Sequence, residues 1–208
     1  MTLTGDMETT SWQDNLPASK LRGVQLATAL FALARLYAEA PSQDVVARFV
    51  DPAMAATWPV RDEASLEALA QMGKASDMGC LKSEFATLIG PGGIVPMAES
   101  HYLGVDPLPL SQELARSYRE EGYSSPKMAT LPRDHVAVEL GFLAHLVLGT
   151  QEDSGLEQVW HFREGHLDRF ISDLLGCLEE NATSVIRALV QLTRATLANL
   201  EEFTAGHE

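Results

Sequence analysis

The fold is decided by residues 132–149, which read PRDHVAVELGFLAHLVLG. Drawn as a helix, this segment has apolar side chains on nearly every face, at Val136, Val138, Leu140, Phe142, Leu143, Leu146, Val147 and Leu148. A helix that is apolar all round in a globular protein is enclosed by other elements. The segment therefore predicts the central helix of a bundle, with Pro132 in its first turn.

Amphipathic helices are expected on both sides of this segment. Apolar spacing and the positions of capping and breaking residues predict helices over 19–40, 42–50, 65–72, 78–89 and 111–121 before it, and over 156–178 and 182–203 after it. The sequence offers no convincing pair of strands. We therefore predict an all-α, single-domain helical bundle over residues 19–208, preceded by a flexible N-terminal arm over residues 1–18.

A long ordered loop is expected between the fourth and fifth of these helices. Gly90-Pro91-Gly92 ends the fourth helix, and prolines and glycines interrupt residues 92–109 too often for a regular element. Long loops inside compact domains are usually functional or disordered, and Val95 and Met97 make this one too apolar for disorder. It also contains a carboxylate, a hydroxyl, an imidazole and a phenol in succession, at Glu99-Ser100-His101-Tyr102.

Composition restricts the location and the partners of the chain. Hydrophobic residues make up 46% and charged residues 21%, which is typical of a globular protein. Charges such as Arg35 and Arg187 interrupt the best apolar stretches, and the N-terminus lacks a secretory signal, so we expect a cytoplasmic protein without stable membrane insertion. A formal net charge of -14 disfavours nucleic acid and suits a cationic partner. Cys80 and Cys177 belong to no redox or metal pattern and are expected to be free thiols.

A second polar group opens the central helix, at Asp134-His135 with Glu139 one turn later. Asp134 is expected to accept hydrogen bonds from first-turn amides. His135 and Glu139 share one helix face and so form half of a conceivable metal site, although no second pair at ligand spacing accompanies them. A buried Glu139 needs a partner, because an unpaired carboxylate is costly to bury.

Two interpretations of these polar residues stay open. In the first, the carboxylates converge beside apolar walls and form an acidic-edged groove for an arginine-bearing peptide, with Glu99, Asp134, Glu139, Tyr102 and Phe142 contributing. In the second, Glu99 and Glu139 are internal struts that bond loop amides to the central helix.

Enzymatic chemistry has weaker support. Ser100 and His101 are sequence neighbours without a visible base-and-orienter arrangement, and Gly90-Pro91-Gly92-Gly93 lacks the Lys-Ser/Thr of a phosphate-binding loop. We therefore predict a protein that is not an enzyme and needs no cofactor or metal. The alternative from another class is a nucleotide- or metal-dependent hydrolase that uses His135 and Glu139.

Three motifs resemble the TorD/DmsD family of redox-enzyme maturation chaperones, which is related to the nitrate reductase delta-subunit family. They are Glu84-Phe85, Leu88 and Gly90-Pro91; then Pro96, Glu99-Ser100 and Tyr102; then Pro132, Asp134-His135, Glu139-Leu140 and Phe142. The resemblance covers most of the chain, from about Leu21 to Phe203. The chain departs from the family at Ile89 and Met97, where aromatic residues are common.

The resemblance implies an all-helical cytoplasmic chaperone. It would bind the twin-arginine signal peptide and the apo form of a molybdopterin oxidoreductase, assist cofactor insertion and delay export. Asp134 and His135 correspond to the family's peptide-binding Asp-His, with Glu99, Ser100 and Tyr102 beside them; Pro132, Glu139 and Phe142 complete the expected peptide-binding set. A permanent accessory subunit of a reductase is another alternative. A homodimer by helix swapping is expected to hinge at Ser124-Ser125-Pro126.

Overall fold

The computed structural model describes residues 17–42, 44–45, 48, 51–74, 78–150 and 155–205. Helices are the regular elements of these ranges, and the only β-type contact found there is an isolated antiparallel bridge between Ala98 and His135. The all-α prediction is confirmed. The arm predicted over residues 1–18 lies outside the described residues, except for its last two positions. No helix in the described ranges combines the length and apolar character that crossing a bilayer requires.

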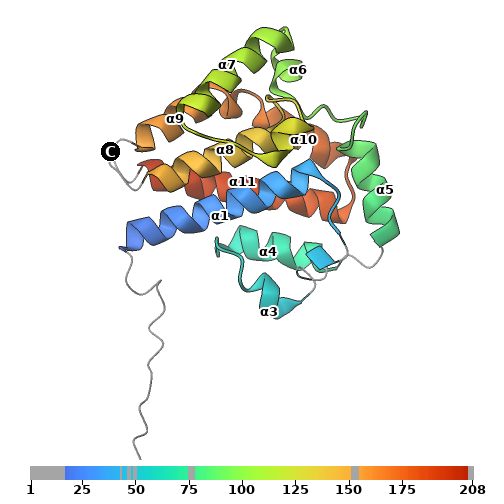
Figure 1. Cartoon of the computed structure of the whole chain (residues 1–208). Helices are drawn as coiled ribbons and strands as arrows, with labels where there is room; N and C mark the ends of the chain where they lie inside the picture. Colours follow the sequence, from blue (N-terminus) through green and yellow to red (C-terminus); the bar gives the residue numbers. More distant parts are fainter. Residues whose placement is uncertain are drawn as a thin grey trace, which may run out of the picture.

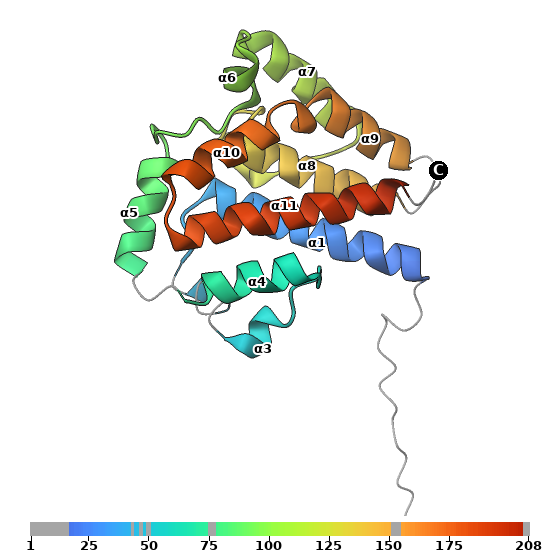
Figure 2. The ribbon, with the colours of Figure 1, turned by 180° about the vertical axis from the view of Figure 1, so that it is seen from behind.

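The centre of the bundle is α8 (Val136–Gly149), as its sequence predicts. α1 (Ala18–Ala38) packs along α8, α11 (Ser184–Ala205) packs on α1, and α4 (Glu63–Met72) packs on α11. Figures 1 and 2 show α1, α8 and α11 running lengthwise through the molecule, with α4 and the short α3 (Pro52–Ala55) outside them. Fully buried leucines fill the core, among them Leu30, Leu33, Leu140 and Leu143. Burying each contributes about 1.5–3 kcal/mol.

The prediction of a single helix over residues 156–178 is wrong. The chain instead forms α9 (Gly155–Gly165), a 3-10 turn (Leu167–Arg169) and α10 (Ile171–Asn181). Gly165 weakens the helix, and His166 leaves helical geometry with φ -131 and ψ -80. The break allows α9 to pack on α8 while α10 packs on α11.

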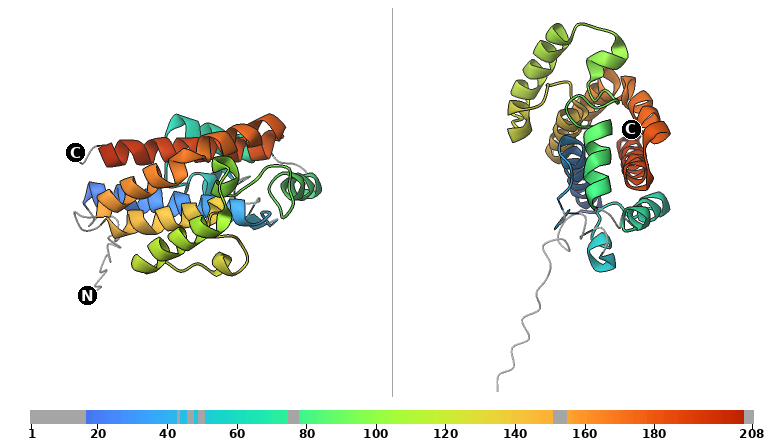
Figure 3. Two further views of the ribbon diagram at one scale, coloured as in Figure 1. Left: turned by 90° about the horizontal axis from the view of Figure 1, so that it is seen from above. Right: turned by 90° about the vertical axis from the view of Figure 1, so that its right-hand side faces the viewer.

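The predicted loop over residues 92–109 is partly helical. After α5 (Met78–Leu88), which lies crosswise at one end of the bundle (Figure 3), the chain reaches the short α6 (Glu99–Leu103). Gly104 ends α6 with a left-handed φ of 63. α7 (Pro107–Glu120) then begins earlier than predicted, because Asp106 rather than Ser111 accepts the capping hydrogen bond, from the amide of Leu108 at 2.9 Å.

The predicted start of the central helix at Pro132 is also wrong. α8 begins at Val136 with His135 as its N-cap, and Pro132 is exposed in the preceding turn, where its carbonyl accepts from the His135 amide at 3.2 Å. Between α7 and this turn lies a 3-10 turn (Pro126–Ala129) capped by Ser125. The central helix is therefore shorter than predicted, and the residues in front of it are free to make other contacts.

Smaller expectations have mixed outcomes. The hydroxyl of Ser42 accepts from the amide of Val45 at 3.4 Å, as expected of a cap, although much of the segment 42–50 lies outside the described residues. Asp51, which was expected to end that segment, begins α3, because its Oδ1 accepts from the Ala53 amide at 2.9 Å. Cys177 is a free, half-buried thiol, and the side chain of Cys80 is outside the description.

Candidate functional site

Two stretches that are far apart in the sequence are joined through their backbones. The amide of Glu99 donates to the carbonyl of Asp134, and the amide of Val136 donates to the carbonyl of Met97, both at 2.8 Å. The antiparallel bridge between Ala98 and His135 lies between these two bonds. We call residues 97–100 and 134–136 the joint. It connects the start of α6 to the start of α8.

Asp134 reinforces the joint with its side chain. Its Oδ2 accepts from the hydroxyl of Ser100 at 2.5 Å and from the amide of Ser100 at 3.3 Å. Asp134 is only 1% exposed, so these bonds replace water at a buried carboxylate. The expectation that Asp134 caps its own helix is wrong, because its carboxylate caps the first turn of α6 instead.

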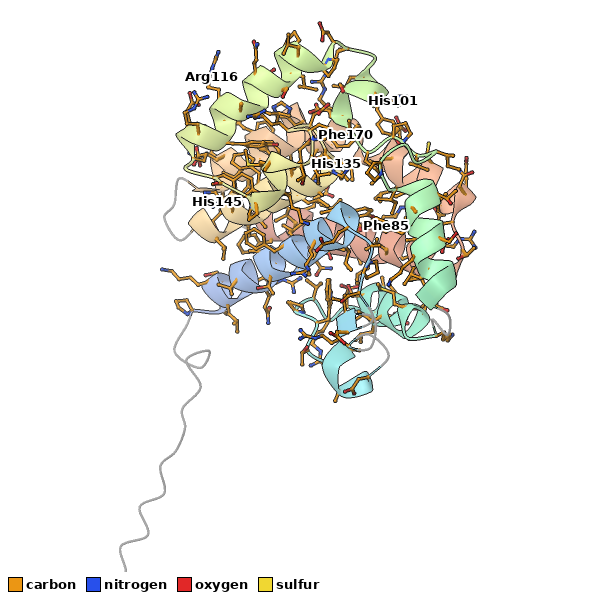
Figure 4. All side chains as sticks on the ribbon, turned by 45° about the vertical axis from the view of Figure 1, so that its right-hand side comes forward. Phe85, His101, Arg116, His135, His145 and Phe170 are labelled. Carbon is orange, nitrogen blue, oxygen red and sulfur yellow. The ribbon has the colours of Figure 1, made fainter. Side chains whose placement is uncertain are left out.

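His135 takes the capping role at α8. Its Nδ1 accepts from the amide of Ala137 at 3.1 Å. Burial lowers the pKa of His135 from 6.5 to about 4, against the opposing effect of the Asp134 carboxylate. The imidazole is therefore neutral at pH 7, which is the state that can accept a hydrogen bond at Nδ1. Figure 4 shows His135 inside the molecule and the exposed His101 on the outer side of α6.

Glu99 extends the joint to the break between α9 and α10. Its Oε2 shares a hydrogen bond with Nδ1 of His166 at 3.1 Å, and both side chains are buried. Its Oε1 has no hydrogen-bond partner within the described residues. His166 had no assigned role in the sequence analysis, although the glycine before it, which interrupts a helical pattern, is a local signal for a break at this position.

Glu139 is fully buried, and neither of its carboxyl oxygens has a hydrogen-bond partner in the described part of the chain. Desolvation, followed by the charges of Glu99 and Asp134, raises the pKa of Glu139 well above 4.5. The charges of Glu99 and Asp134 therefore act on Glu139. The expectation that a partner satisfies Glu139 is not met there, and protonation removes the cost of a buried charge instead.

Aromatic side chains surround the joint. The hydroxyl of Tyr102 donates to the carbonyl of Pro96 at 2.9 Å, and its ring lies 6.0 Å from that of Phe170. The hydroxyl of Tyr118 donates to the carbonyl of Arg133 at 2.8 Å. Its ring lies 4.6 Å from that of Phe142, which is itself buried in α8. These hydrogen bonds tie both tyrosines to backbone carbonyls that immediately precede the two stretches of the joint.

The structure brings together the predicted site residues but seals most of them inside. Glu99 and Glu139 are 0% exposed, and Asp134 is 1% exposed. In the part of the chain that is described, no group of three or more His, Cys, Asp or Glu side chains has a metal-binding arrangement. His166, which is bonded to Glu99 of this cluster, also lines a hollow in the neighbouring surface.

This hollow lies between α7, α8 and α9, which Figure 1 shows close together. We call it the α7–α9 groove. Its volume is about 210 Å³, and Phe142, Leu146 and Phe162 give it apolar walls, while Glu120 and Glu121 add carboxylates from the end of α7. Gln158 and His166 also line it. Of these residues the sequence analysis assigned only Phe142 to a binding site and named Leu146 only as an apolar position of the central helix, because exposed glutamates at a helix end carry no distinguishing pattern.

The fold and the polar joint define an all-α bundle built around one buried, carboxylate-rich connection. Residues 56–175 match the family model described as "Nitrate reductase delta subunit". This range is more than half of the 208 residues and contains the joint, Glu139, Phe142 and His166. The chain therefore belongs to the nitrate reductase delta-subunit family, a TorD-type family of redox-enzyme maturation chaperones, and the resemblance drawn from the motifs is confirmed. Comparison with curated proteins finds no match.

Proposed function

We propose that this protein is a cytoplasmic chaperone that binds the twin-arginine signal peptide and the apo form of a molybdopterin oxidoreductase. It would assist cofactor insertion and delay export until insertion is complete. Proteins of the family act with molybdoenzyme partners. A peptide ligand needs recognition without covalent chemistry, and an acidic chain suits a partner that carries arginines.

The observation that carries the proposal is the joint. It brings Glu99, Ser100, Asp134 and His135 into direct contact from two distant stretches, which are the stretches that the family motifs occupy. Around it, Tyr102 is half-buried and Pro132 is exposed, so both are accessible to a bound peptide. Glu139 and Phe142 stand behind the joint in α8 and would act by supporting it.

Because Glu99, Asp134 and Glu139 are buried, they would not contact the arginines of a peptide directly. Asp134 would shape the peptide-binding surface by fixing α6 against α8, and its role in binding would be that of a positioning residue. A leader peptide would dock beside the joint through apolar side chains and arginines. Helix swapping at Ser124-Ser125-Pro126 stays a prediction.

Titration of a fluorescently labelled twin-arginine leader peptide tests this function. We expect micromolar or tighter binding by the full chain and a loss of at least about tenfold in affinity for Asp134→Asn, which weakens the Ser100 contact while keeping the shape of the side chain. Thr28→Ala, on the exposed side of α1, is the matched control. Absence of binding by the unmodified chain would refute the proposed function, whereas binding that Asp134→Asn leaves unchanged would remove the joint from it.

A further inference from the structure

The α7–α9 groove contains an unpartnered acceptor. Gln158 lines the groove, and its Oε1 is buried without a hydrogen-bond partner among the described residues. A buried amide oxygen without a donor costs about 1–3 kcal/mol. A ligand that supplies an N–H group to this oxygen would remove that free-energy cost. The unpartnered oxygen therefore points to a ligand that donates hydrogen bonds.

The rim of the groove is negative. Glu120 is the last residue of α7 and Glu121 is its C-cap; both are exposed, and no ion pair involving either is found in the described structure. α7 has 14 residues, and the end of a helix carries a partial negative charge that adds to the two carboxylates. Arg116, the labelled cation of α7 in Figure 4, is exposed and does not line the groove. Arg119, in the last turn of α7, is also exposed and does not line the groove, so the two carboxylates are the charges that α7 contributes to its lining.

The walls of the groove are aromatic. The rings of Phe142 and Phe162 meet edge to face, with their centroids 4.8 Å apart, and His166 lies 5.2 Å from Phe162. Aromatic faces attract a guanidinium group, which is weakly hydrated and planar. The volume of about 210 Å³ is smaller than the roughly 300–1,000 Å³ of a typical small-molecule site and suits one long side chain.

We propose that the α7–α9 groove is the arginine-binding subsite for the leader peptide, with Glu120 and Glu121 holding the guanidinium and Gln158 accepting one of its N–H groups. A guanidinium has five donors in a planar fork, so it satisfies a carboxylate and the amide oxygen together, whereas a lysine ammonium acts as a compact point charge. The hydrogen bond between His166 and Glu99 connects this subsite to the joint. This inference rests on the proposed function, since it assigns the contacts of the same peptide.

The test compares a twin-arginine leader with the same peptide carrying two lysines. The double variant Glu120→Gln/Glu121→Gln is expected to lower affinity for the arginine peptide by at least about tenfold and to change affinity for the lysine peptide much less. The control Glu164→Gln/Glu201→Gln removes two carboxylates from a different groove, which Trp160 also lines, and is expected to change affinity less than about twofold. Equal losses in the two double variants, or no loss in the first, would overturn the proposal.

Gln158→Met gives an independent readout. Replacing the half-buried Gln158, whose buried Oε1 is unpartnered, by an apolar side chain of similar length is expected to maintain or raise the melting temperature while it weakens binding of the arginine peptide. Reduced affinity caused by a damaged fold would instead lower both quantities. Unchanged affinity would contradict the assignment of Gln158.

Failure of the proposed function is distinguishable from failure of this inference. If the unmodified chain binds neither peptide, the proposed function fails. A titration with N-acetyl-arginine amide then tests separately whether the α7–α9 groove binds an arginine side chain. Nuclear magnetic resonance should then show a shift of the Gln158 side-chain amide in the unmodified chain and none in Glu120→Gln/Glu121→Gln. No shift in the unmodified chain would refute the subsite.

Discussion

The hydroxyl of Ser100 donates to Oδ2 of Asp134 at 2.5 Å, across 34 positions of sequence. Together with the two backbone bonds beside it, this contact fixes the first turn of α6 against the start of α8. Ser100 and Asp134, which the family motifs assign to peptide binding, are thus hydrogen-bonded to each other. Any effect of these residues on binding is expected to come with an effect on stability.

Removal of this contact should destabilise the protein. We expect Ser100→Ala to lower the free energy of unfolding by about 1 kcal/mol and Asp134→Ala by about 1–3 kcal/mol, because the second change leaves the amide and the hydroxyl of Ser100 without their acceptor. Urea denaturation followed by circular dichroism measures both. A loss below about 0.5 kcal/mol for Asp134→Ala would mean that water replaces the carboxylate and that the joint is open.

Glu139 should make the protein less stable as the pH rises. Its pKa in the folded state lies well above 4.5, so the folded chain holds a proton that the unfolded chain releases, and stability falls from about pH 4.5 upward to the raised pKa. The slope that one proton contributes is at most about 1.4 kcal/mol per pH unit. Glu139→Gln should remove this contribution. The stability of this variant should therefore fall less between pH 5 and pH 8 than the stability of the unmodified chain.

The control for that experiment is Glu113→Gln, which changes an exposed glutamate on α7. Its pH dependence of unfolding should match that of the unmodified chain. If Glu139→Gln also leaves the curve unchanged, Glu139 is ionised in the folded protein and has a partner or a water path.

His135 should have the opposite pH dependence. Burial lowers its pKa to about 4, so the unfolded chain binds a proton between that value and 6.5 that the folded chain does not. Stability is therefore complete above about pH 6.5 and decreases by up to about 3 kcal/mol as the pH falls toward 4.

Two substitutions separate this titration from the capping role. His135→Asn keeps a capping acceptor without the titration and should flatten the acid side of the stability curve, while His135→Ala should also cost about 1 kcal/mol at pH 7 through loss of the cap. Guanidinium denaturation at pH 4.5, 5.5 and 7 checks both. An acid slope that persists in His135→Asn would assign the titration to another group.

A pair of glycines tests the geometry of α6. Gly104 has a left-handed φ of 63, so Gly104→Ala should destabilise the protein by about 1 kcal/mol. Gly176 lies inside α10, where an added Cβ has no heavy atom within 4 Å, so Gly176→Ala should stabilise the protein by about 0.5–1 kcal/mol. Thermal unfolding of the two variants should move in opposite directions. A shared direction would show that α6 does not end at Gly104 as described.

The sequence predicted the fold best where the distribution of apolar residues is clear, either on all faces of a helix or on one face. The apolar residues of α8 and the amphipathic pattern of α11 identified the core helices because burial determines those patterns. Boundaries were less predictable. A proline in the first turn is typical of a helix start, yet Pro132 precedes α8, since backbone bonds from the distant residues 97–99 take up the chain just before Val136.

The candidate site was predictable as a set of residues, while the direction of each contact was not. Asp134 and His135 both suit a helix cap, and only the position of Ser100 decides that Asp134 serves α6 while His135 serves α8. Glu84, singled out by a family motif, accepts from the hydroxyl of Thr183 at 2.7 Å and so ties α5 to the beginning of α11. His166 and Gln158 gain their significance from tertiary contacts, which a single sequence does not display.

Hydrogen exchange of the backbone amides with and without a twin-arginine leader peptide locates the peptide on the chain. If the joint and the α7–α9 groove hold the leader, the amides of Glu99, Ser100 and Val136, together with those at the end of α7, should exchange more slowly in the complex. Protection confined to α4 and α11, with no change at these amides, would contradict the proposed binding surface.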